Sequence, residues 1–340
     1  MTRTIVEASA PGKLFLTGEY AVLDGAPALV AAIDRRVVVR AAFGPGAGDL
    51  VVDALAERER FVVSASLRAD LAGGDVGAVL AAVECSGFAL GERAAEFVVD
   101  SRPFLTGERK LGLGRSAATL VAAVAACLAA DGRADAAEIL GRALAANARF
   151  QDGRGSGGDV AAAVHGGVVE VRRGPAGLAA APRGLPTGLH LVVGWTGEPA
   201  PTAPLLARFD PRRAPAALAA LAAVADEAAA AAVAGDADRL LEAVDRSHDL
   251  LARLGEDTGL PIVTPTLARL VAAARRAGAA AKPSGAGAGD CGLALARSAA
   301  QAEAVRAAWR EAGVLPLPLA ITPDGVRHAH VERALRVARA

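Results

Sequence analysis

The sequence predicts an α+β fold made of two domains. Its 340 residues are enough for one large core or for two fused cores. Strand-like and helical segments follow one another without a regular repeat, which favours mixed sheets that carry helices on one side. The stretch at 172–188 is rich in Gly and Pro and is the best candidate for a linker. We therefore expect one domain over residues 1–186 and a second over residues 187–340.

The first half contains the clearer strand signals. Apolar runs rich in Val predict its strands, and the Pro-Gly-Lys segment between the first two predicts a loop over residues 10–25. The predicted strands lie at 3–8, 27–42, 95–100 and, in short stretches, within 49–66. The predicted helices lie at 75–86, within 112–131, at 134–149 and from Asp159 onward.

The second half is expected to be more helical. A strand at 189–195 precedes three Ala-rich helices between about 203 and 277. A strand at 291–296 and a helix at about 299–312 follow, and β-like edges complete the chain.

Charge and hydropathy argue against several classes of partner. Basic and acidic residues both number 37, so the formal net charge is zero, and neither nucleic acid nor an anionic membrane is expected as the main partner. The longest apolar runs, 117–130 and 216–234, are shorter or more charged than the ~20 apolar residues that cross a bilayer. The N-terminal segment lacks an apolar signal core. We therefore expect a soluble cytoplasmic protein, monomeric or homodimeric.

Lysine is rare in this chain and is found beside glycine. Among the 37 basic residues only Lys13, Lys110 and Lys282 are lysine, and all three flank Gly- or Ser-rich segments. An ammonium group is a compact charge that fits beside a phosphate or carboxylate, where the planar fork of arginine is bulkier. Chance placement on the surface is the alternative, and the chemistry of the flanking segments makes it the less favoured one.

The segment at 110–118, KLGLGRSAA, predicts a phosphate site. Gly112 and Gly114 let a ligand approach the backbone closely, and the apolar helix that follows presents unpaired N–H groups in its first turn. Ser116 adds a hydroxyl for a phosphate or for Mg²⁺. The segment fits neither the P-loop pattern nor GxGxxG, and a tight turn with a capping serine would also explain it.

Two further glycine-rich segments carry charged residues. Residues 282–292, KPSGAGAGDCG, have ordered apolar sequence on both sides, which favours a backbone cradle for an anion over a linker. Residues 153–161, GRGSGGDVA, place Asp159 at the start of a buried helix. A lone Asp there is more often a helix cap. Phosphoryl transfer, however, needs few groups: a carboxylate, a cation and Mg²⁺.

The order of these segments resembles the GHMP kinases. APGKLFLTGEYAVLDG, GLGRSAA and KPSGAGAGDCG are similar to the three motifs of that family and occur in the same order between residues 10 and 292. Within the family, GEY in the first motif, GSGGDVAAAVHGG, VVGWTGEPAPT and KPSGAGAGDCG look like phosphomevalonate kinases. The resemblance covers nearly the whole chain.

The resemblance implies a fold and a reaction. The implied fold has an N-terminal nucleotide-binding domain like ribosomal protein S5 domain 2 and a C-terminal ferredoxin-like α/β domain, with the site between them. The implied reaction is the ATP- and Mg²⁺-dependent phosphorylation of 5-phosphomevalonate, a small phosphorylated substrate, in the mevalonate route to isoprenoids. An acceptor phosphate is already ionised near neutral pH, with a second pKa of about 6. We therefore expect Lys13 and Mg²⁺ to matter at least as much as proton removal by Asp159.

The resemblance also assigns roles by position. The catalytic pair is Lys13 and Asp159. The nucleotide loop comprises Gly112, Leu113, Gly114, Arg115, Ser116 and Ala117. The residues expected to contact substrate or its phosphates are Lys110, Ser156, Thr202, Ser284 and Ala286. The residues expected to bind Mg²⁺ are Ser116 and Glu19.

Two positions depart from the family pattern. The second motif usually reads Ser-Ser, whereas this chain has Arg115-Ser116. Arg115 could contact the ATP phosphates or the substrate, or point outward. Ala288 stands where glycine is usual, a change that is tolerated unless the position needs a positive φ.

Three alternatives stay open. Mevalonate kinase is the nearest, with a hydroxyl acceptor and Asp159 as a base; a phosphate acceptor instead requires extra cations, for which Lys110 and Arg115 are candidates. Mevalonate diphosphate decarboxylase is less favoured because the second motif lacks its Ser-rich run. A catalytically silent GHMP-fold binding protein would have little reason to keep both Lys13 and Asp159.

Overall fold

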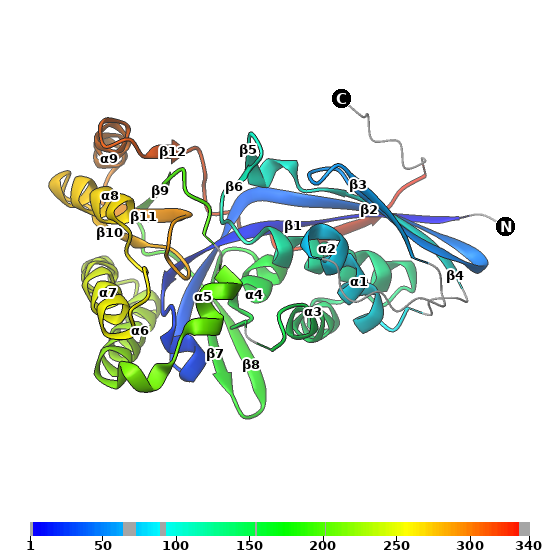
Figure 1. Cartoon of the computed structure of the whole chain (residues 1–340), viewed down its shortest axis with the longest axis horizontal. Coiled ribbons are helices and arrows are strands. Elements are labelled where there is room, and N and C mark those ends of the chain that lie inside the picture. The colour runs from blue at the N-terminus through cyan, green and yellow to red at the C-terminus, as the bar shows by residue number, and fades with distance from the viewer. Residues whose placement is uncertain (1–2, 64–72, 89–92, 154, 201, 333–340) are drawn as a thin grey trace.

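The chain folds around two main sheets, each with helices packed against it. The computed structural model describes residues 3–63, 73–88, 93–153, 155–200 and 202–332 (Figure 1). Both helices and strands occur in each half, so the predicted α+β class is confirmed.

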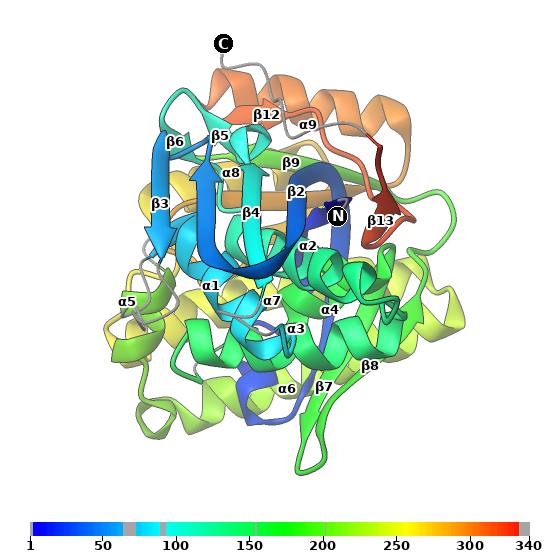
Figure 2. The same cartoon turned by 90° about the vertical axis from the view of Figure 1, so that its right-hand side faces the viewer.

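The first sheet has seven strands within the described residues, in the order β13-β1-β2-β7-β8, with β3 and β4 also paired to β2. The strands are β1 (Thr4–Thr17), β2 (Pro27–Ala54), β3 (Glu59–Val63), β4 (Arg93–Asp100), β7 (Val168–Gly174), β8 (Gly177–Arg183) and β13 (Arg327–His330). Strand β2 doubles back on itself, and β4 lies between its two halves (Figure 2). The chain turns near Gly46, whose φ of 83° suits glycine, so residues 49–54 are a continuation of β2.

Strand β1 runs through the segment that was predicted to be a loop. It continues from Thr4 to Thr17, and its pairing with β2 shifts between Pro11 and Gly12. A bulge at this point accommodates a proline that cannot donate a ladder hydrogen bond. The prediction of a loop over residues 10–25 was therefore wrong for residues 10–17, and the first motif lies on a strand.

Four helices cover one face of the first sheet. They are α1 (Gly74–Cys85), α2 (Arg115–Ala130), α3 (Ala136–Phe150) and α4 (Gly158–His165), close to the predicted ranges (Figure 1). Helix α2 is buried almost throughout because its side chains are mainly Ala, which lets the sheet and the other helices approach it closely. A short hairpin, β5 (Leu105–Thr106) and β6 (Arg109–Lys110), precedes α2 and follows a 3₁₀ turn, η2 (Arg102–Phe104).

The segment at 172–188 is mostly a hairpin. Strands β7 and β8 pair from Val168 with Arg183 to Gly174 with Gly177, and they extend the first sheet. Pro182 is accommodated because β8 is the edge strand. Composition alone predicted a linker here, and that prediction was wrong for residues 172–183.

The second sheet is antiparallel and has the order β10-β11-β9-β12. Its strands are β9 (His190–Trp195), β10 (Ala280–Pro283), β11 (Cys291–Ala296) and β12 (Leu315–Leu317). One helical stretch links β9 to β10 and helix α9 (Ala299–Glu311) links β11 to β12, so the chain follows a βαββαβ path. This topology confirms the expected ferredoxin-like unit.

The helical stretch between β9 and β10 contains four helices where three were predicted. They are α5 (Thr202–Arg208), α6 (Pro215–Ala234), α7 (Ala237–Thr258) and α8 (Pro265–Arg276). Helix α6 is long and apolar enough to cross a membrane by length and composition, but half of its most apolar window is buried inside the fold. It packs against α7 and β2, and its exposed Asp226 forms an ion pair of 2.9 Å with Arg172 of β7.

The end of the described chain returns to the first sheet. Ile321 forms an isolated bridge with Ile33 of β2, and β13 then pairs with Val6–Ser9 of β1. Residues within 187–340 thus complete the sheet that residues 1–186 begin.

Candidate active site

A cleft of about 730 Å³, including its open mouth, lies where the two sheets approach each other. Its lining contains eight residues that the sequence predicted: Lys13, Glu19, Gly112, Ser156, Asp159, Thr202, Ser284 and Ala286. The other predicted residues lie on the loop and helix start beside Gly112: Lys110, Leu113, Gly114, Arg115, Ser116 and Ala117. The structure therefore brings five sequence-distant segments to one place.

Lys13 is fixed by its backbone to the loop at residues 110–114, which is called the phosphate loop after its predicted role. Its N–H donates to the carbonyl of Leu113 at 2.9 Å, which ties β1 to the loop. Its side chain runs past Gly114, where a Cβ would stand 2.8 Å from the lysine Cγ, and its ammonium lies 5.4 Å from the centre of the Phe15 ring. Glycine at 114 is therefore needed both for this close approach and for its φ of 79°.

The phosphate loop leads directly into α2. Gly112 and Gly114 both have positive φ, and Gly114 is the residue before the first turn of the helix. Ser116 and Ala117 lie in that first turn, where backbone N–H groups lack helical partners and the helix dipole favours an anion. This geometry suits an anion, and anion binding by the loop stays a prediction.

Asp159 lies in the first turn of α4. Gly157, with φ of 79°, begins the helix, and the Ser156 hydroxyl accepts the N–H of Gly158 at 3.2 Å. The Asp159 carboxylate accepts the N–H of Val160 at 3.0 Å. Gly158 packs tightly against Phe15, since a Cβ there would lie 3.1 Å from the ring. This packing holds the carboxylate on the wall of the cleft that also carries Lys13.

The third glycine segment is bound to the end of β1. The Ser284 hydroxyl accepts the N–H of Phe15 at 2.9 Å and donates to the carbonyl of the same residue at 3.1 Å. The Tyr20 hydroxyl donates to the carbonyl of Ala286 at 2.6 Å. Because the one hydroxyl proton of Ser284 is already used, a substrate contact by this group would have to be through its oxygen; that contact stays a prediction.

Glu19 forms a buried ion pair with Lys282. Both side chains are almost completely excluded from solvent, and the same carboxylate oxygen also accepts the N–H of Gly285 at 3.2 Å. Burial lowers the pKa of Lys282, and the neighbouring Glu19 charge opposes that shift. These contacts use Oε1 of Glu19, so a metal ion would have to bind its other carboxylate oxygen, and the Mg²⁺ contact of Glu19 stays a prediction.

Asp290 is a cleft residue that the site prediction missed. Its carboxylate accepts the N–H of Ala200 at 2.9 Å and presses against Gly112, where a Cβ would lie 2.2 Å from the aspartate Cγ. Burial raises the pKa of Asp290, while Lys13 and Lys110 lower it. Its position after three alternating glycines was the available signal. Tyr20, Phe15 and Gln151 also line the cleft and were not assigned.

A second cleft, of about 800 Å³ including its open mouth, lies beside the β5–β6 hairpin. It is lined by residues 55–58, which follow β2, and by Arg102, Leu105, Gly107 and Glu108 around the β5–β6 hairpin. Lys110, at the end of that hairpin, is exposed. The Arg115 side chain is buried and pairs with Glu57 and Asp75, so any nucleotide contact by residue 115 would use its backbone.

Comparison with known proteins gives one family. The model of the GHMP kinases N terminal domain matches residues 77–167, and that of the GHMP kinases C terminal matches residues 228–315. A phosphomevalonate kinase of Streptomyces sp. (strain CL190) is 39% identical over 95% of this chain and 99% of its own length. A mevalonate kinase of Aeropyrum pernix is 35% identical over 86% of this chain and 89% of its own length.

Solved structures share the fold. A Lin0012 protein from Listeria innocua superposes with a TM-score of 0.83 at 22% identity, covering 96% of this chain and 99% of the other. A Streptococcus pneumoniae phosphomevalonate kinase in complex with phosphomevalonate and AMPPNP gives a TM-score of 0.75 at 23% identity, covering 93% and 99%. With both family models matched in order and a relative 39% identical over nearly its full length, the chain belongs to the GHMP kinase family.

Proposed function

We propose that this GHMP kinase transfers the γ-phosphoryl group of ATP to the phosphate of 5-phosphomevalonate, giving 5-diphosphomevalonate and ADP. The observation that carries the proposal is the meeting of Lys13, Asp159 and the phosphate loop at one cleft. The choice of acceptor is supported by the phosphomevalonate kinase that is 39% identical over 95% of this chain.

In the proposed reaction, an oxygen of the acceptor phosphate attacks the γ-phosphorus and the bond to the β–γ bridging oxygen breaks. The α2 amino end and Lys13 would stabilise the charge on the transferring group. Asp159 would orient the acceptor and take up its proton when the acceptor arrives protonated. Because that phosphate is largely ionised near neutral pH, alignment and charge are the larger contributions.

Magnesium fits the site as an ion carried mainly by the nucleotide. Within the described part of the chain, no group of three or more His, Cys, Asp or Glu side chains could hold a metal by itself. Mg²⁺ commonly keeps waters and binds through substrate phosphates with one or two protein oxygens. The Ser116 hydroxyl, in the first turn of α2, is the protein oxygen we assign to it, and bound Mg²⁺ would neutralise charge on the β- and γ-phosphates.

Mevalonate kinase is the second candidate function. Among the described residues that line the cleft, Lys13 is the only Lys or Arg, although a phosphorylated acceptor calls for further cationic groups. The Aeropyrum pernix mevalonate kinase, 35% identical over 86% of this chain, also supports it. Lys110 is near enough to lower the pKa of Asp290, so it is the residue we expect to supply the missing charge for a phosphate.

A coupled ADP-release assay with MgATP separates the two candidates. It compares 5-phosphomevalonate with mevalonate at matched concentrations, in wild type and in Lys110→Met. We expect phosphomevalonate to be strongly preferred, and Lys110→Met to raise its KM about tenfold while leaving the KM for MgATP less affected. Preference for mevalonate would overturn the acceptor assignment and keep the kinase fold.

A further inference from the structure

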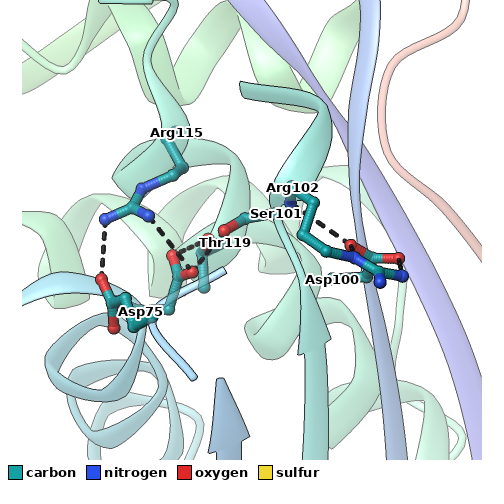
Figure 3. A network of polar contacts seen from close by, with 7 residues as sticks. Asp75, Asp100, Ser101, Arg102, Arg115 and Thr119 are labelled. Atoms are coloured by element: carbon teal, nitrogen blue, oxygen red, sulfur yellow. Dashed lines mark hydrogen bonds and ion pairs between the residues drawn. The ribbon is translucent and has the colours of Figure 1, made fainter. Parts of the chain in front are cut away.

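Two helix amino ends meet at a buried arginine beside the phosphate loop. Arg115 lies in the first turn of α2, is 9% exposed, and donates from Nη2 to Glu57 Oε1 at 2.7 Å. Its Nη1 lies 3.7 Å from Asp75 Oδ2, in the first turn of α1 (Figure 3). The arginine that replaces the usual serine therefore points into the protein and away from the cleft.

The partner carboxylates are themselves fully engaged. Asp75 has no exposed surface; Thr119 donates to its Oδ1 at 2.8 Å, and the Ser101 hydroxyl donates to its Oδ2 (Figure 3). The N–H of Asp75 donates to both oxygens of Glu57 at 3.1 Å. The network thus joins α1, α2, the end of β4 and the turn after β2.

The charges in this network balance. One guanidinium faces two carboxylates, and the amino ends of α1 and α2 add partial positive charge. A cation in the first turn of a helix opposes the helix dipole unless it is neutralised, and Glu57 and Asp75 neutralise it here. The backbone N–H groups in the first turn of α2 therefore stay available for an anion.

The network also holds one end of a loop that is otherwise easy to deform. Glycines at 112 and 114 give the loop wide conformational freedom. One end of it is tied to β1 through Lys13 and Leu113, and the other continues into Arg115. Glu57 also lines the second cleft, so the same ion pairs reach from that cleft to the loop.

We propose that Arg115 is a positioning residue for the phosphate loop, held by Glu57 and Asp75 so that the N–H groups around Ser116 are aimed at the nucleotide. This inference rests on the proposed function in one respect, that the loop binds nucleotide. It does not depend on which acceptor the enzyme uses.

Titration calorimetry with MgADP, in the absence of any acceptor, tests the proposal. We expect Arg115→Ser, which restores the usual residue but removes the ion pairs, to raise the Kd for MgADP about tenfold or more, and Arg115→Lys to fall between it and wild type. Glu57→Gln keeps the shape of the side chain and should raise the Kd in the same direction. If Arg115→Ser does not fold, the Kd of Glu57→Gln for MgADP tests the positioning role instead.

The matched control is Arg275→Ser. Arg275 on α8 also pairs with two carboxylates, Asp245 at 2.8 Å and Asp249 at 3.0 Å, but it lies in the other half of the molecule. The Arg275→Ser substitution should lower the melting temperature and leave the Kd for MgADP within about twofold of wild type. A folded Arg115→Ser with a Kd also within twofold would overturn the proposal.

The outcomes separate this proposal from the proposed function. If the wild-type protein binds MgADP but does not phosphorylate 5-phosphomevalonate, only the proposed acceptor is wrong. If the wild-type protein binds no MgADP, both the positioning role of Arg115 and nucleotide binding by the phosphate loop are overturned. Under assay conditions, Arg115→Ser should raise the KM for MgATP much more than the KM for the acceptor.

Discussion

Lys13 and Asp159 approach the cleft from different structural elements, a strand and a helix start. If the acceptor is an ionised phosphate, the cation contributes at least as much as the carboxylate. We expect Lys13→Met to lower kcat about 100-fold or more, and Asp159→Asn to lower it by about tenfold to 100-fold. Steady-state kinetics with saturating MgATP measure both. An Asp159→Asn variant with near-full turnover would leave the aspartate a structural role only.

Asp290 supplies a pH dependence of stability. Because its pKa is raised in the folded state, the neutral carboxyl is favoured there, and wild type loses stability as pH rises through that pKa. Asp290→Asn removes this loss. The difference in free energy of unfolding, variant minus wild type, should therefore increase from pH 4 to pH 8. Urea denaturation at several pH values measures it.

Asp210 is the control for this experiment. Its pKa is lowered, chiefly by a hydrogen bond from Arg212, so its ionised form is the one favoured in the folded state. The stability of Asp210→Asn relative to wild type should therefore fall with rising pH below about pH 4, where this carboxyl titrates, and stay nearly flat from pH 4 to pH 8. Parallel pH trends in the two variants would contradict the assignment for Asp290.

Elements with local signals could be predicted from the sequence. Helix α3 has an Asp135 cap and an amphipathic pattern, and β11 is a six-residue apolar run between a glycine segment and a cap, so both were predicted within two residues. Strand β10 contains Lys282 and Pro283, a pair that does not predict a buried strand. It pairs with β11, and its lysine can be buried because it contacts Glu19, 263 residues away.

Other features depend on pairing that composition does not reveal. The β7–β8 hairpin looks like a linker by its Gly and Pro content and is fixed by its pairing with β2. For the site, the glycine loops, Lys13 and Asp159 were predictable because their chemistry is local to short motifs. The orientation of Arg115 was not, since it is set by Glu57 and Asp75, 58 and 40 residues away in the chain.

The third glycine segment contains two non-glycine residues with a positive φ, Ala288 and Asp290 (φ of 55°). Ala288 has φ of 63°, the region in which a Cβ is disfavoured and glycine is not. Its N–H still donates to the carbonyl of Ile262 at 3.1 Å, so the conformation is fixed by its surroundings. The usual glycine at this position therefore has a structural reason.

Ala288→Gly should raise the free energy of unfolding by about 1 kcal/mol, because relief of the left-handed conformation exceeds the added freedom of the unfolded chain. Chemical denaturation measures the change. The control is Ala308→Gly in the interior of α9, which should lower it by about 1 kcal/mol. A destabilised Ala288→Gly would contradict the analysis of this loop.

At the scale of the whole molecule, the two sheets are joined by polar contacts beneath the cleft. Lys282 with Glu19 is the buried ion pair among them. Removing one partner of a buried pair leaves an uncompensated charge, so Lys282→Met should lower the free energy of unfolding by about 3–5 kcal/mol. Glu19→Leu combined with Lys282→Met should be less destabilised than Lys282→Met alone.

An exposed pair provides the comparison. Arg246 and Glu227 link α7 to α6 at 2.5 Å, with both side chains about half exposed. Arg246→Ala should change stability by less than about 1 kcal/mol. Denaturant unfolding of all three variants decides the point, and a Lys282→Met variant that matched Arg246→Ala would show that the buried pair does not hold the sheets together.

The pairing of β13 with β1 has a consequence for biosynthesis. The edge partner of β1 at Val6–Ser9 is Arg327–His330, which is synthesised more than three hundred residues later. Until then that edge presents unpaired N–H and C=O groups, which can pair with the wrong strand. The nascent chain therefore carries an open sheet edge while those intervening residues are synthesised. A stop codon placed just before residue 327 would make that transient exposure permanent.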